Sequence, residues 1–487
     1  MIMTTIFASL IAAAATFLFM RVLLKRSLGF SVSFALAMIA AINIDLYKPL
    51  LENVGSMLGT NTVLGIAAIM MLVLLFLKVP VFIAVLCASM LYFVFNPGIN
   101  QIIFGQKSIL GVENNALLAI PFFVCQATFM NYTGVSDRMF DFCAMMTGRL
   151  PGGLAQVNVV LSAIMGGMSG SNLADAASDA KYLVPQMVRK GFSNEFSSVV
   201  SATSAMITPL IPPGIAMILY GCIADVSIGK LFVSGLGVGV TLCIAQMILV
   251  HFISVKRGYK PIRTTPLTRD LFFTSLKPAI LPLCLPIIIM GSIRLGICTA
   301  TEAGAIATVY SILLGILYKE LKPKFVLQAC KETVSTTASI MLIVSAASIF
   351  SWVLTKERVP QQLTEWIVSV CPNKYAFLIA VNILVLIAGM FIEGNATMIV
   401  LVPLLAPVAA QYGIDEIHFA MFYIFNNAIG ALSPPMGTLM FVVCGITKCK
   451  TKDFIKEAVP FYIMLVIVLL LLTFFPIFTT GLVNLVY

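Results

Sequence analysis

The sequence predicts an all-α polytopic membrane protein built as an inverted repeat, in which each half contains a re-entrant helical hairpin and a broken helix. Of its 487 residues, 60% are hydrophobic and 10% are charged, and apolar runs long enough to cross a bilayer recur along the chain. Two of these runs contain Pro-Pro breaks at matching positions. The charges that flank the two copies have opposite signs, which favours entry from opposite faces of the membrane.

The composition argues against several other classes of protein. The net charge is +10, but the basic residues fall in short loops, where they indicate membrane orientation rather than nucleic-acid binding. The 11 cysteines have no framework spacing, and the 2 histidines are too few for a metal centre or a histidine-based catalytic group. We therefore expect a membrane protein that binds no nucleic acid and needs no cofactor.

Residues 1–60 are predicted to form an N-terminal extension with two membrane helices, at about 2–20 and 29–47. The basic cluster between these helices places their connection in the cytoplasm. Residues 61–487 then form the main domain. Its first helices are expected at 62–77, 79–95 and 116–130, with an external connection at 96–114.

The first repeat is expected at about residues 116–256, with its hairpin at 154–188. Its other elements are an interfacial helix at 135–146, a broken helix at 196–221 and a return helix at 228–252. The second repeat is expected at about 333–480, with its hairpin at 376–411. Its other elements are an interfacial helix at 359–370, a broken helix at 417–444 and a last helix at 458–474, and two crossings at 278–293 and 302–318 join the repeats.

Both halves carry the same spacing of helix breakers. Gly191 precedes Pro212 by 21 residues, and Gly413 precedes Pro434 by the same 21 residues. Because Pro lacks an N–H and Gly has little helical preference, we expect both helices to unwind at membrane depth. Irregular backbone is tolerated there only beside a cavity or an ion, so the breaks predict a binding site.

The ends of the two hairpins differ in charge. The end of the first hairpin carries basic residues and the end of the second carries acidic residues, namely Lys181, Arg189 and Lys190 against Asp415 and Glu416. Since cytoplasmic loops collect Lys and Arg, the two hairpins should enter from opposite faces.

Small polar residues gather at the hairpin tips and at the Pro-Pro breaks. The candidate ion- and substrate-binding residues are Ser169, Gly170, Ser171, Asn172, Asp175, Thr208, Pro212, Pro213, Gly214, Glu393, Gly394, Asn395, Thr397, Asn426, Asn427, Ser433, Pro434, Pro435 and Gly437. Half-helix N-termini suit a carboxylate, and their C-terminal carbonyls suit Na⁺. Hydroxyl and amide oxygens outnumber carboxylates here, which favours Na⁺ over H⁺ as the coupling ion. The expected Na⁺ ligands are Ser169, Gly170, Ser171, Asn395 and Thr397.

Four charged residues near these positions need separate interpretation. Glu302 opens a predicted helix, where it is expected to stabilise the N-terminus. Asp175 and Glu393 are each compatible with helix capping or with support of an ion site. Arg294 lies at the end of a crossing and is interpreted as an interfacial residue, with binding of a substrate carboxylate as the alternative.

Several long motifs occur in order over about residues 62–482. They are GRLPGGLAQVNVV, GGMSGSNLADAASDAKYLVPQMVRKGF, IPPGIAMILYGCIADVSIGKLFVSG, TATEAGAIATVYSILLG, AASIFSWVLT and IGALSPPMGTLMFVVCGI. Together they resemble the large membrane subunit of tripartite ATP-independent periplasmic (TRAP) transporters. The N-terminal extension lies outside the usual large subunit.

This resemblance implies a secondary active importer of the bacterial inner membrane, with an inverted-repeat, ion-transporter-like fold. A Na⁺ gradient would drive import of a small carboxylated solute by an elevator-type motion. The implied partners are a small four-helix membrane subunit and a periplasmic solute-binding protein. The resemblance places the ion sites at the hairpin tips and Pro-Pro breaks. Many members have an Asp-Pro-Thr type of second tip, and the EGNAT sequence here departs from it.

Two alternatives belong to other classes. The inverted repeat alone would also allow a stand-alone ion-coupled transporter of organic anions without a binding protein. An intramembrane enzyme would have to use Asp175 and Asp179, which share one helix face at i, i+4. The sequence offers no nucleophile–base arrangement beside them, so we expect no enzyme.

Overall fold

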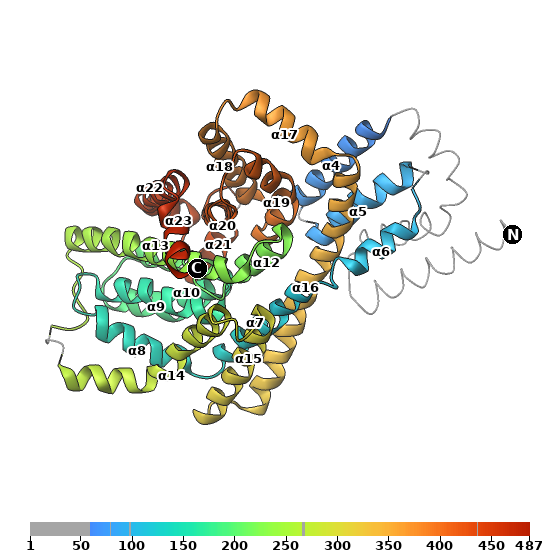
Figure 1. The fold of residues 1–487 in the computed structure, drawn as a ribbon. Helices are drawn as coiled ribbons and strands as arrows, with labels where there is room; N and C mark the ends of the chain where they lie inside the picture. The colour runs from blue at the N-terminus through green and yellow to red at the C-terminus, as the bar shows by residue number, and fades with distance from the viewer. Residues whose placement is uncertain (1–58, 78, 97–98, 265–267, 436) are drawn as a thin grey trace, which may run out of the picture. The chain divides into compact units, whose positions relative to one another are not determined.

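The computed structural model describes residues 59–487 except 78, 97–98, 265–267 and 436, and the regular elements of this part are helices (Figure 1). The two helices expected in the N-terminal extension lie outside the described residues. Seven described helices are long and apolar enough to cross a membrane, or up to nine if each of two bent pairs counts as one span. The chain divides into two compact units between Ser108 and Ile109.

The first unit contains α4 (Thr60–Phe76), α5 (Val81–Phe95) and most of α6 (Ile102–Leu110). The connection expected at 96–114 contains a helix, α6, which was not expected from the sequence. The side chain of Asn100 accepts a 3.0 Å hydrogen bond from the Ile102 N–H, and this cap satisfies one of the free donors at the start of the helix.

The first half of the second unit has the expected order of elements. After α7 (Ala119–Asn131) come α8 (Val135–Thr147), α9 (Gly153–Ser169), α10 (Asn172–Arg189), α11 (Asn194–Ser204), a short 3₁₀ turn η3 (Thr208–Leu210), α12 (Ile215–Ala224) and α13 (Ile228–Arg257). Helices α9 and α10 form the first hairpin. The segment Asn194–Leu210 and α12 are bent by 43°, which confirms the break at the Pro-Pro pair.

The second half repeats this order. Its elements are α17 (Val359–Val370), α18 (Lys374–Phe391), α19 (Gly394–Gln411), α20 (Glu416–Leu432), α21 (Thr438–Thr447) and α22 (Thr451–Phe474). Helices α18 and α19 form the second hairpin, and α20 and α21 are the two pieces of the second broken helix. The Pro-Pro peptide bond is cis at both breaks. A further helix, α23 (Ile477–Val486), follows and was not expected from the sequence.

Three long helices connect the two halves. They are α14 (Arg269–Arg294), α15 (Ala300–Leu317) and α16 (Pro323–Lys356). Helix α14 begins earlier than the predicted residue 278, because the Thr268 hydroxyl caps it by accepting from the Leu271 N–H at 3.4 Å. Helix α15 begins with a capping box formed by Thr299 and Glu302, which confirms the stabilising role expected for Glu302.

An asparagine links hairpin and broken helix in each half. In the first half, Asn158 of α9 donates to the Ser201 hydroxyl at 2.6 Å and accepts from the Ser204 hydroxyl at 2.9 Å, both on α11. In the second half, the Asn426 amide on α20 donates to the carbonyl and side-chain oxygens of Asn382 on α18, at 2.8 and 2.9 Å. Buried amides need such partners, so each hairpin's first arm is fixed to its broken helix.

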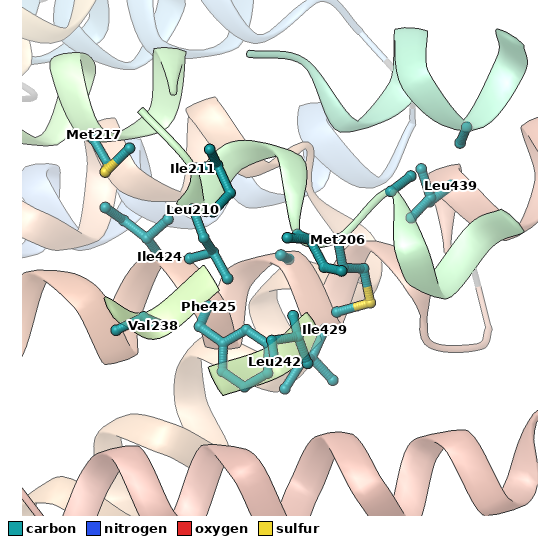
Figure 2. Close-up of a cluster of buried hydrophobic side chains, with 14 of the residues drawn as sticks. Met206, Leu210, Ile211, Met217, Val238, Leu242, Ile424, Phe425, Ile429 and Leu439 are labelled. Carbon is teal, nitrogen blue, oxygen red and sulfur yellow. The ribbon is translucent and has the colours of Figure 1, made fainter. Parts of the chain in front are cut away.

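The two broken helices pack against each other through a common apolar core (Figure 2). Figure 2 shows Met206, Leu210 and Met217 of the first break beside side chains of α13 and α20. Phe425 and Leu439, from the two pieces of the second broken helix, belong to the same core and are fully buried. The unwound segments of both halves are therefore held by one well-packed region, which fixes the hairpin tips relative to each other.

Candidate functional site

The tips of both hairpins line one cavity of about 600 Å³. The candidate residues that line it are Ser169, Gly170, Ser171, Asn172, Glu393, Gly394, Asn395 and Asn427. Further walls come from α7, α16 and the beginnings of α12 and α21. The tertiary structure thus brings together residues that lie more than 200 positions apart in the sequence.

The first tip turns sharply and packs on the first break. Gly170 has φ 62°, a left-handed conformation that favours glycine. A Cβ atom on Gly170 would lie 2.8 Å from the carbonyl oxygen of Pro213, so no larger residue fits this approach. Helix α10 then begins with Ser171 as its N-cap, whose hydroxyl accepts weakly from the Ala174 N–H at 3.5 Å.

Asp175 lies behind the first tip and does not line the cavity. It is buried, and its Oδ2 atom accepts a 2.8 Å hydrogen bond from the Thr208 hydroxyl at the first break. Asp179, one turn further along α10, accepts from the Ser162 hydroxyl of α9 at 3.0 Å. The two carboxyl groups therefore fasten α10 to the broken helix and to the other arm of its hairpin.

At the second tip, Glu393 caps a helix. Its Oε2 atom accepts from the Ala396 N–H at 3.3 Å, at the start of α19. The Asn427 amide of α20 donates to the carbonyl oxygen of Gly394 at 2.8 Å and so fixes this tip to the second broken helix. Thr397 is buried, does not line the cavity, and turns its hydroxyl back to the Glu393 carbonyl at 3.2 Å.

The remaining candidate residues lie at the breaks, or in α20 in the case of Asn426, rather than on the cavity wall. They are Thr208, Pro212, Pro213, Gly214, Asn426, Ser433, Pro434, Pro435 and Gly437. Asn426, next to Asn427 in the sequence, points instead to Asn382. The Ser433 hydroxyl donates to the Ile429 carbonyl of its own helix at 2.8 Å. These residues therefore do not line this cavity.

Two buried oxygen atoms on the cavity wall have no hydrogen-bond partner among the described residues. They are the hydroxyl oxygen of Ser169 and the Oδ1 atom of Asn427, from residues only 6% and 5% exposed. Because a buried polar atom without a partner is costly, each of these oxygens has the capacity to bind a ligand or a water molecule in the cavity. Ser169 belongs to the first hairpin tip, and Asn427 is bonded to the second tip through its amide.

Sequence reasoning missed the walls contributed by α7 and α16. Buried Gln126 of α7 donates to the Met168 carbonyl at 3.0 Å and thereby supports the first tip. A glutamine inside an apolar helix was a detectable signal. The polar spacing of α16 was another, with Glu332, Ser335 and Ser339 on one helix face. Arg294 does not line the cavity, and its side chain donates to the Val486 carbonyl at 3.2 Å.

Paired hairpins and broken helices around one cavity define a multi-pass membrane transporter. The chain belongs to the tripartite ATP-independent periplasmic transporter family, DctM component, whose model matches residues 68–478. It is therefore a permease and not an enzyme. The match begins after the N-terminal extension, as the sequence predicted.

Named relatives and a solved structure agree with this assignment. The chain is 36% identical over 407 residues to the sialic acid TRAP transporter large permease protein SiaM of Vibrio cholerae, covering 83% of this chain and 95% of the relative. It is 32% identical over 377 residues to the C4-dicarboxylate large permease DctM of Pseudomonas aeruginosa, covering 76% and 87%. The fold is similar to the YdaH transporter of Alcanivorax borkumensis, with a TM-score of 0.51 at 13% identity, covering 78% of this chain and 88% of that one.

Proposed function

We propose that this permease imports a small carboxylated organic solute with a Na⁺ gradient as the energy source. The observation that carries the proposal is the meeting of both hairpin tips at one cavity with an unpartnered buried oxygen beside each. Relatives named for sialic acid and C4-dicarboxylates support a carboxylated solute. An elevator-type movement of the two hairpins with their broken helices would expose this cavity to each side of the membrane in turn.

Na⁺ suits the oxygen atoms that surround the tips. Hard monovalent and divalent cations are bound by carbonyl, hydroxyl and carboxyl oxygens, and the tips supply Ser169, Ser171, Asn395 and Asn427. The C-terminal end of α9 adds the partial negative charge of its carbonyl groups beside Ser169. We therefore assign Na⁺ to the tips, with Asn427 replacing Thr397 in the expected set of ligands.

Two protein partners complete the proposed system. A periplasmic solute-binding protein would deliver the solute, and a small four-helix membrane subunit would pair with this chain, since the relatives are named as parts of TRAP systems. The alternative function, a stand-alone organic-anion transporter, predicts instead that uptake proceeds with free solute and no binding protein.

Uptake in proteoliposomes tests the proposal directly. The full chain and its small subunit are reconstituted, the loaded binding protein is added outside, and an inward Na⁺ gradient is imposed. Each component is then withheld in turn, with K⁺ replacing Na⁺. Accumulation that requires Na⁺, the small subunit and the binding protein supports the proposal. Equal uptake without the binding protein favours the stand-alone transporter, and uptake that follows a pH gradient alone overturns Na⁺ coupling.

A further inference from the structure

The cavity has a wall of polar side chains that the hairpin tips do not provide. This polar wall consists of Thr128 and Asn131 of α7 and Glu332, Ser335, Thr336 and Ser339 of α16. On α16 the members recur at intervals of three, four and seven residues, so they form a continuous stripe along one helix face. The stripe offers mainly hydroxyl groups, which pair with the hydroxyl groups of a solute.

The charges around the cavity are unusual for a site that accepts an anion. Among the described lining residues there is no Lys, Arg or His, and the acidic members are Glu332 and Glu393. Positive character must therefore come from a bound cation or from the N-termini of half-helices. Each carboxylate of a solute needs one such partner, because an unpaired buried anion is strongly disfavoured.

Of the two helices that begin at the hairpin tips, only α19 has an acidic side chain at its N-terminus that lines the cavity, because Asp175 in the first turn of α10 lies behind the first tip. Glu393 caps α19 with its own carboxyl oxygen on the Ala396 N–H. The corresponding position on α10 is held by the neutral hydroxyl of Ser171 at 3.5 Å from the Ala174 nitrogen. The buried, unpartnered hydroxyl of Ser169 lies beside this N-terminus and lines the same cavity. Of the two tips, the first is therefore the better place for a solute carboxylate, because the Glu393 carboxylate at the second tip repels one.

Glu332 adds a second carboxylate to the cavity lining, on the polar wall, where its side chain is exposed. Its Oε1 atom accepts from the Tyr132 hydroxyl at 2.7 Å and from the Gln328 amide at 3.1 Å. Both bonds hold the side chain in place and leave Oε2 to accept from a solute donor. A hydroxyl or ammonium group satisfies Oε2, whereas a second carboxylate does not.

We propose that the cavity selects a solute with one carboxylate and several hydroxyl groups, and that Glu332 and Glu393 discriminate against dicarboxylates. This inference rests on the proposed function and narrows its substrate class. A cavity of about 600 Å³ lies within the size range of sites that enclose such polyhydroxylated acids. The polar wall would bind the hydroxyl groups, and the first tip with its cation would bind the carboxylate.

Binding measurements on the chain with its small subunit in nanodiscs test the selectivity. Thermal-shift titrations in Na⁺ buffer use sialic acid and gluconate as polyhydroxylated monocarboxylates and succinate as the dicarboxylate, because a ligand that binds the native state raises its melting temperature. We expect both monocarboxylates to bind at least about tenfold more tightly than succinate. Glu332→Gln and Glu393→Gln should each reduce the ratio of monocarboxylate affinity to succinate affinity. Each variant removes a negative charge that repels the second carboxylate but keeps an oxygen acceptor.

Glu365→Gln on α17 is the matched control, because Glu365 is exposed and does not line the cavity, and it should leave the ratio unchanged. Ser335→Ala combined with Thr336→Val should weaken sialic acid and gluconate and leave succinate unchanged. The inference is overturned if succinate binds as tightly as the monocarboxylates, or if neither Glu variant changes the ratio of the two affinities. In either case, Na⁺-dependent uptake would still support the proposed function. Loss of all Na⁺-dependent uptake, whichever solute is offered, overturns both.

Discussion

The hydroxyl group of Thr208 donates a 2.8 Å hydrogen bond to the buried carboxyl group of Asp175. Thr208 belongs to the first break and Asp175 to the second arm of the first hairpin, so this bond joins the unwound backbone to the tip that it supports. Two segments that the sequence separates by 33 residues thus act as one unit.

Thr208→Val should destabilise the protein, because it removes this hydrogen bond and leaves the Asp175 carboxyl group buried with one partner fewer. The expected cost is about 1–3 kcal/mol, seen as a lower melting temperature of the purified protein in detergent. Thr208→Ser keeps the hydroxyl group and should remain close to the original stability. If both variants melted alike, the hydrogen bond would have no part in holding the hairpin.

Gly170→Ala should abolish uptake, because the added methyl group would lie 2.8 Å from the Pro213 carbonyl oxygen and force the first tip away from its break. Gly413→Ala is the matched control. Gly413 has a similar φ of 66°, but no heavy atom lies within 4 Å of its Cβ position. Gly413→Ala should destabilise the protein by only about 1–2 kcal/mol, the cost of placing alanine in a left-handed conformation, and should retain uptake. Equal activity of the two variants would contradict the role assigned to close packing at the tip.

Replacing Asn427 should change the Na⁺ dependence of uptake, whereas replacing its neighbour Asn426 should change the stability of the protein. Asn427→Ala removes an unpartnered oxygen from the cavity wall and the amide that binds Gly394, so the Na⁺ concentration for half-maximal uptake should rise at least about tenfold. Asn426→Ala removes the link to Asn382 and should mainly lower the melting temperature, by loss of about 1–3 kcal/mol. Sodium titrations of uptake and thermal melts of both variants separate these effects. An unchanged Na⁺ dependence in Asn427→Ala would remove that residue from the ion site.

Cys449 should react slowly with maleimide, and faster as the pH rises. It is 7% exposed and lies between α21 and α22, where burial raises the pKa of its thiol and the carboxylates of Glu195 and Asp453 raise that pKa further. A raised pKa means less of the reactive thiolate at neutral pH, so the rate should increase through a pH range above that of a free cysteine. Mass spectrometry of the labelled peptide follows this rate. The exposed Cys330 provides the comparison, and a Cys449 rate that is high and independent of pH near neutrality would refute the assignment.

The sequence alone determined the helical membrane class, both hairpins and both breaks. These features depend on local physics, since adjacent Pro and Gly residues interrupt a helix and apolar runs of sufficient length cross a bilayer. Residues such as Ser171 and Asn373 also mark helix starts locally, because their side chains cap the adjacent N–H groups. The family motifs carried the same information at longer range and identified the family.

Only the tertiary structure decided which polar residues share the cavity. Asn426 and Asn427 are equivalent in the sequence, yet one faces Asn382 and the other the second tip, because neighbouring residues on a helix point about 100° apart. Glu332 enters the cavity wall because α16 packs beside α7, which no local pattern specifies. Hydrophobic periodicity defines which helices form, whereas long-range packing defines which of their polar groups meet.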